Sequence, residues 1–128
     1  MTNKSYYGDY MSKSAFTLKV FGIYLIILGI VLIIVPNILF SIFGLPETSE
    51  VWIRVVGVLA FNIGVYYIFA AKSEAKAFFH ASVYTRLFVF IAFSVFAGLG
   101  LTKPILILFG GIDLLGGIWT FIALRTEK

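Results

Sequence analysis

Two ionisable side chains interrupt apolar stretches of this sequence, and they are its first candidates for chemistry. Asp113 stands in the run Gly-Gly-Ile-Asp-Leu-Leu-Gly-Gly at 110–117, and Arg86 stands in a stretch rich in phenylalanine. Charged groups in such surroundings can bind a polar headgroup, an ion or a proton. They can also pair with each other and fix which helices meet and in what register. Both interpretations remain open from the sequence.

Other polar side chains fall at a similar depth in the apolar segments. The candidate ligand-binding or structural cluster is Asp113, Arg86, Asn62, Tyr66 and Tyr24. Counted along helices at about 1.5 Å per residue, Tyr24, Asn62 and Arg86 lie about 12–14 Å from the same end, and Asp113 about 16–17 Å. Because a guanidinium can hold a carboxylate with two parallel hydrogen bonds, we predict that Arg86 and Asp113 lie within salt-bridge reach, directly or through one water.

No recognised catalytic or metal-binding motif accompanies this cluster. The chain has no cysteine, which excludes disulfides, thiolate metal sites and thiol nucleophiles. Its single histidine, His80, has no partner at metal-ligand spacing and is interpreted as an interfacial residue. The sequence also lacks a Walker loop, a Ser/His/Asp order and a His-x-x-x-His helix. We therefore assign no catalytic residue, metal or cofactor.

Four apolar segments must position these side chains. The 128 residues are 61% hydrophobic and 12% charged, far from the soluble balance of roughly half apolar and a quarter charged. Segments 15–35, 51–71, 78–101 and 104–124 each reach the ~20 residues needed to cross a bilayer as a helix. The sequence thus predicts an all-α polytopic membrane protein, with one domain of four transmembrane helices in a single bundle.

The link between the first two spans has a distinct composition. Pro36 and Pro46 bracket an apolar, aromatic segment that is too short to cross a membrane. We predict a short interfacial helix there, with a packed loop as the alternative. Trp52 and Arg54 are expected at the outer interface, with Arg54 as an anchor, a salt-bridge partner or part of an outer gate.

Basic residues gather on one side of the predicted spans. They occur in the polar N-terminal segment 1–14, at Lys72 and Lys76 between the second and third spans, and at Arg125 after the fourth. By the positive-inside rule both termini are cytoplasmic. The net charge is +4, but the basic residues form no patch on a polar face, so nucleic acid is not expected as a partner.

Glycines recur at a spacing of seven residues in three of the spans. The pairs are Gly22 with Gly29, Gly57 with Gly64, and Gly110 with Gly117. This spacing returns to one helix face and lets backbones approach closely, either within one bundle or between protomers. The phenylalanine-rich third span is expected to supply bulk against these stripes or to face lipid.

The stretch 53–64, Ile-Arg-Val-Val-Gly-Val-Leu-Ala-Phe-Asn-Ile-Gly, together with segment 110–117, resembles small bacterial membrane proteins of the DoxX-like kind. The likeness spans most of the chain. It implies a compact four-helix bundle in a bacterial inner membrane and gives no catalytic residue. Small multidrug transporters share the size and helix count, but their essential carboxylate lies in the first helix, which has none here.

Three functions remain open. The favoured one is a binding or accessory protein that holds a lipid-like or amphipathic ligand, or docks partner helices, around the polar cluster. The alternative is an oligomeric small transporter or channel that uses Asp113 as a proton or cation site. A membrane enzyme acting on a lipid or isoprenoid is the least favoured. The expected partners are membrane lipids, further copies of the chain, or another membrane protein.

Overall fold

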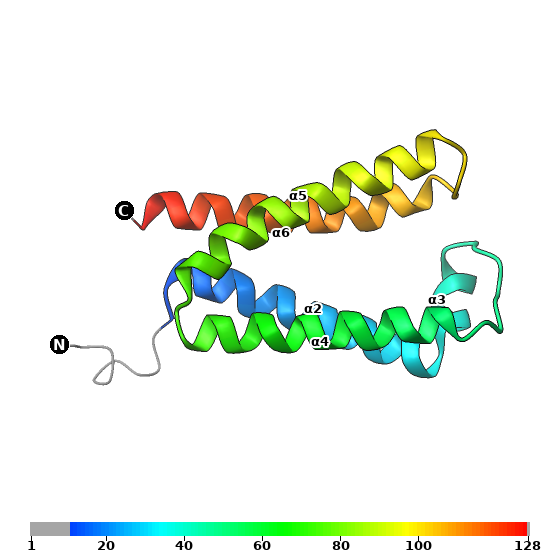
Figure 1. Cartoon of the computed structure of the whole chain (residues 1–128), viewed down its shortest axis with the longest axis horizontal. Helices are drawn as coiled ribbons and strands as arrows, with labels where there is room; N and C mark the ends of the chain where they lie inside the picture. The colour runs from blue at the N-terminus through cyan, green and yellow to red at the C-terminus, as the bar shows by residue number, and fades with distance from the viewer. Residues whose placement is uncertain (1–10, 128) are drawn as a thin grey trace.

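The computed structural model describes residues 11–127, and the regular structure in this range is entirely helical (Figure 1). Its elements are α2 (Lys13–Ile34), α3 (Pro36–Ile42), α4 (Trp52–Lys72), α5 (Lys76–Gly98) and α6 (Ile105–Thr126). The four long helices are long and apolar enough to cross a membrane, and their bounds differ from the predicted ones by at most three residues. The predicted short helix between the first two spans is confirmed as α3. Most of the polar segment 1–14 lies outside the described residues.

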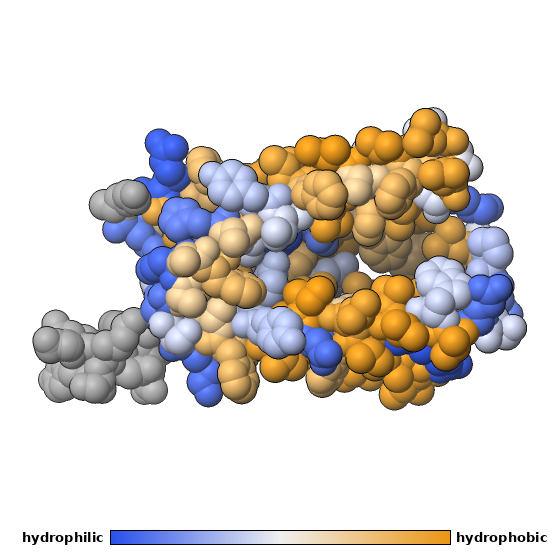
Figure 2. All heavy atoms as spheres, in the orientation of Figure 1, coloured by the Kyte–Doolittle hydropathy of each residue, from blue (hydrophilic) through white to orange (hydrophobic). Residues whose placement is uncertain are grey.

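The long helices form two layers. Helices α2 and α4 pack antiparallel in one layer and α5 and α6 in the other, and the α2–α6 contact joins the layers (Figure 1). The layers meet where α2 and α5 begin and α4 and α6 end, which we name the closed end. They separate toward α3. Apolar side chains cover the middle of the molecule, whereas hydrophilic ones gather at its two ends, the closed end and the end at α3 (Figure 2).

Direct backbone contact joins α2 to α4. A Cβ atom built on Gly64 would lie 2.7 Å from the carbonyl oxygen of Gly22, and one built on Gly29 would lie 2.7 Å from that of Gly57. No side chain fits at these distances, so only glycine permits this approach. The glycine stripes predicted for the first two spans therefore face each other within one bundle.

The predicted glycine stripe of α6 faces α5. A Cβ built on Gly110 would lie 3.2 Å from Cα of Phe90, and one built on Gly117 would lie 3.5 Å from Cβ of Arg86. Outside the stripe, a Cβ built on Gly116 would lie 2.9 Å from the Phe21 ring in α2. Some phenylalanines of α5 thus fill space beside α6, whereas Phe88 and Phe96 are exposed, so each predicted alternative applies to part of this span.

Carboxylates from two other segments cap the start of α2 at the closed end. The backbone N–H of Ser12 donates to Oε2 of Glu74 at 2.9 Å, and that of Ser14 donates to Oε2 of Glu127 at 2.7 Å. Nζ of Lys76 lies 2.8 Å from Oε1 of Glu127. Because the first N–H groups of a helix lack partners in the helix and carry a partial positive charge, these acids satisfy α2 and tie it to α5 and α6.

We predict that Gly64→Ala destabilises the protein, because the added methyl group would overlap the backbone of α2. Overpacking of this kind costs roughly 1–3 kcal/mol. The matched control is Gly111→Ala, since a Cβ at Gly111 meets nothing within 4 Å. Thermal unfolding in detergent, followed by circular dichroism, measures both. Equal melting temperatures for the two variants would contradict the backbone contact.

We predict that acid weakens the closed end through Glu127. Partial burial acts to raise its pKa, but hydrogen bonds from Lys76 and Ser14 and the charge of Lys76 outweigh that effect and lower the pKa. A carboxyl group whose pKa is lower in the folded state stabilises fully above its unfolded pKa of about 4.3, and that contribution disappears as pH falls through the folded value.

Melting temperatures of wild type and Glu127→Gln between pH 7 and pH 3 test this expectation. The gap between the two proteins should narrow as the pH falls. Glu47→Gln is the control, because Glu47 is an exposed glutamate in the loop before α4. A gap that stays constant down to pH 3 would show that Glu127 does not contribute through its charge.

Candidate functional site

A cavity of about 300 Å³ lies between the two layers on the side toward α3. All five described helices contribute to its wall, and the space-filling view shows a hollow between the layers at this level (Figure 2). Its lining is aliphatic and aromatic apart from the carboxylate of Asp113 and the hydroxyl of Tyr24. The structure thus brings two of the predicted site residues to one apolar cavity.

Asp113, in α6, is half-buried, and it forms part of the wall of this cavity. Within residues 11–127 it forms no ion pair and no hydrogen bond through its side chain. Arg86 lies close enough for its charge to interact with the carboxylate over a longer distance. The carboxylate is therefore available to a group that enters the cavity.

Arg86 is the largest fully buried side chain, with 2% of its surface exposed. Its Nε donates to the carbonyl oxygen of Ser82 at 3.1 Å, and its Nη2 donates to the hydroxyl oxygens of Ser82 and Thr120, both at 2.9 Å. The Thr120 hydroxyl is also 2.7 Å from that of Thr17 in α2. A chain of hydroxyl groups therefore connects the guanidinium of α5 to α6 and α2.

Aromatic rings cover the guanidinium from the other layer. Its Cζ lies 4.8 Å from the ring centroid of Phe21 and 5.4 Å from that of Tyr67, in the range of cation–π attraction. Nη1 has no hydrogen-bond partner among the described residues, and it lies beside Gly116, where an added Cβ would be 3.2 Å away. Glycine at this position leaves the guanidinium its space.

The expected direct salt bridge between Arg86 and Asp113 is not formed within the described chain. Side chains on a helix lean toward its N-terminus. Because α5 and α6 run antiparallel, Arg86 leans toward the closed end and Asp113 toward α3. Equal depth along the helices therefore does not bring the two charges into contact. The water-bridged form of the pair stays a prediction.

Asn62 and Tyr66 do not lie with Arg86. Both are exposed on α4, Tyr66 to 60%, whereas Tyr67 is 5% exposed and packs against the guanidinium. Tyr67 follows Gly64 by three residues and so shares the helix face that meets α2. The predicted cluster thus contains Tyr66 in place of its buried neighbour Tyr67.

The predicted outer-interface residues lie at the start of α4. Trp52 is exposed, and Arg54 donates from Nη1 to the carbonyl oxygens of Ile33 and Ile34 at the end of α2. Arg54 thus satisfies carbonyl groups that a helix end leaves free. No cluster that could hold a metal ion occurs in the described part of the chain, and His80 is exposed.

Comparison of the chain with protein-family models, curated proteins and solved structures finds no match. The resemblance to DoxX-like proteins therefore stays a prediction. Any functional conclusion for this chain has to come from the geometry of the cavity and of the polar groups around it.

We predict that Thr120→Val destabilises the protein by about 1–3 kcal/mol, because a buried donor of Arg86 loses its acceptor. Thr126→Val is the matched control, since Thr126 is exposed and its hydroxyl donates to the carbonyl oxygen of Ala123 in its own helix. Chemical or thermal unfolding in detergent measures the difference.

Asp113→Asn is expected to lower the stability less than Thr120→Val does. The reverse order would indicate a water-bridged Arg86–Asp113 pair.

Proposed function

We propose that the protein binds one amphipathic, largely apolar molecule in the cavity between its two layers. The observation that carries this proposal is a carboxylate without a partner among residues 11–127, placed in the wall of an otherwise apolar cavity of about 300 Å³. Ligand sites have this character, with mostly apolar walls, a few polar groups and volumes of roughly 300–1,000 Å³.

Asp113 would set the chemistry of the ligand's polar end. A carboxylate facing an apolar space is costly unless a donor satisfies it. A hydroxyl, amide or ammonium group on the ligand would supply that donor, and the Tyr24 hydroxyl lines the same cavity. The aliphatic and aromatic walls would hold an acyl or isoprenoid body.

Binding is favoured over passage through the molecule. Toward the closed end the cavity is followed by a tightly packed layer in which Arg86, Thr17 and Thr120 are each at most 2% exposed. Hydrogen bonds join these three side chains across α5, α6 and α2. Asp113 is the only acidic residue in the four long helices. A transporter that used it would have to break this layer in every transport cycle.

The proposal includes an orientation in a bacterial inner membrane. The closed end would face the cytoplasm, because Lys13, Lys19, Lys72 and Lys76 lie there and the positive-inside rule places such residues inside. The cavity would then open in the outer half of the membrane, beside α3.

Filling the cavity tests the function directly. Val89 lines the cavity, so Val89→Trp is expected to remove most of the molecule that co-purifies with the wild type from its own membrane. Val95→Trp makes the same change on an exposed position of α5 and is expected to retain it. Native mass spectrometry of the purified proteins measures the bound mass and its occupancy.

Two outcomes would count against the proposal. One is equal occupancy in the two tryptophan variants, which would place the bound molecule outside the cavity. The other is a cation or proton flux in liposomes that Asp113→Asn abolishes, which would favour the transporter instead.

A further inference from the structure

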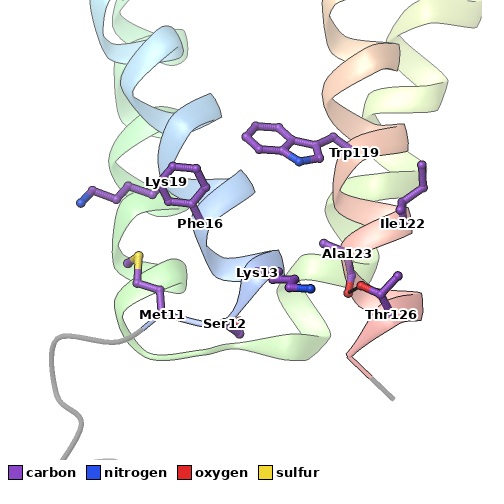
Figure 3. A pocket seen from close by; sticks show the side chains of 9 residues that line it. All are labelled: Met11, Ser12, Lys13, Phe16, Lys19, Trp119, Ile122, Ala123 and Thr126. Carbon is purple, nitrogen blue, oxygen red and sulfur yellow. Dashed lines mark hydrogen bonds between the residues drawn. The ribbon is translucent and has the colours of Figure 1, made fainter.

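A second concave site lies at the closed end, outside the cavity (Figure 3). It is a groove of about 670 Å³ between the start of α2 and the end of α6, lined by nine residues. None of them lines the cavity that contains Asp113. The proposed function leaves this groove unexplained.

The groove changes from polar to apolar along its length. Lys13 reaches across it toward Thr126, and Lys19 extends outward at its rim, beyond Phe16 (Figure 3). Farther from the chain ends, the rings of Phe16 and Trp119 meet edge to face, with centroids 6.0 Å apart and planes at 86°. The groove therefore has a cationic end near the helix termini and an aromatic end deeper in the bundle.

The positive charge of the groove is not neutralised by the carboxylates nearest to it. Glu74 and Glu127 bind the backbone at the start of α2 and the ammonium group of Lys76. Within the described chain, Lys13 and Lys19 form no ion pair. The ammonium group of Lys13, which reaches across the groove, is thus available to an anion from outside.

We propose that this groove binds an anionic phospholipid. The headgroup phosphate would lie at Lys13, since lysine binds phosphate as a point charge, and an acyl chain would run along Phe16 and Trp119. Lysines next to a membrane attract anionic lipids, and a soluble anion would gain nothing from the aromatic end. This site is separate from the proposed function, so either can fail without the other.

Native mass spectrometry of the full chain in detergent, titrated with dioleoylphosphatidylglycerol or dioleoylphosphatidylcholine, tests the proposal. The wild type should bind phosphatidylglycerol more tightly. Lys13→Gln should weaken that binding about fivefold, as expected for one lysine near an anionic lipid. Lys19→Gln should weaken it less, because the Lys19 ammonium group points away from the groove (Figure 3). Both side chains are exposed, so the variants should fold like the wild type.

Two controls separate the groove from general attraction to positive charge. Lys72→Gln removes an exposed charge at the same end outside the groove and should leave binding unchanged. Trp119→Leu should weaken phosphatidylglycerol binding while keeping the preference over phosphatidylcholine. An equal loss from Lys72→Gln, or no loss from Lys13→Gln, would overturn the proposal. Displacement of the lipid by millimolar inorganic phosphate would assign the groove to a free anion instead.

Discussion

The buried guanidinium of Arg86 is the contact on which the rest of the arrangement depends, because all four long helices meet there. Its own helix α5 provides Ser82, α6 provides Thr120 and the space beside Gly116, α2 provides Phe21, and α4 provides Tyr67. A charge held away from water is costly unless hydrogen bonds and polarisable groups surround it. The two layers therefore have to converge at this level. Beyond it no hydrogen bond joins the two layers within residues 11–127, and the cavity lies on that side.

The two layers differ in how rigidly their helices are packed, and this difference affects the width of the cavity. In α2 and α4 the paired glycines bring two backbones into contact over two helical turns, so this layer can change little without breaking van der Waals contact. Helix α6 is shared, because its glycines receive side chains from both α5 and α2. The width of the cavity is therefore set by how α5 and α6 lean against a fixed α2–α4 pair. The contact between the Phe43 and Phe109 rings, 5.2 Å apart, adds a second tie near the α3 end.

Sequence patterns predicted the parts of this structure that depend on helix periodicity. The lengths of apolar runs located the four long helices, and the seven-residue glycine spacing identified the faces of α2 and α4 that pack closely, but not that they meet each other. Three features could not be obtained this way. The direction in which Arg86 and Asp113 lean depends on α5 and α6 being antiparallel neighbours, which spacing along one helix does not encode. The choice of Tyr67 over Tyr66 depends on which face of α4 meets α2, although its offset of three from Gly64 was a usable signal. Capping of α2 by Glu74 and Glu127 joins residues 62 and 113 positions apart.

The opposite leaning of Arg86 and Asp113 has an electrostatic consequence for any occupant of the cavity. A direct salt bridge would have cancelled both charges and left an apolar cavity with no polar contact to offer. Separation keeps the carboxylate at the cavity wall, while the guanidinium remains behind the wall, near enough for the two charges to interact. The positive charge behind the wall weakens the attraction of Asp113 for a full cation, because the two fields oppose each other at the cavity. It weakens a short hydrogen bond far less, since that depends on contact with the carboxylate oxygen itself. For the proposed ligand, this arrangement favours a neutral donor such as a hydroxyl group over an ammonium group as the polar end.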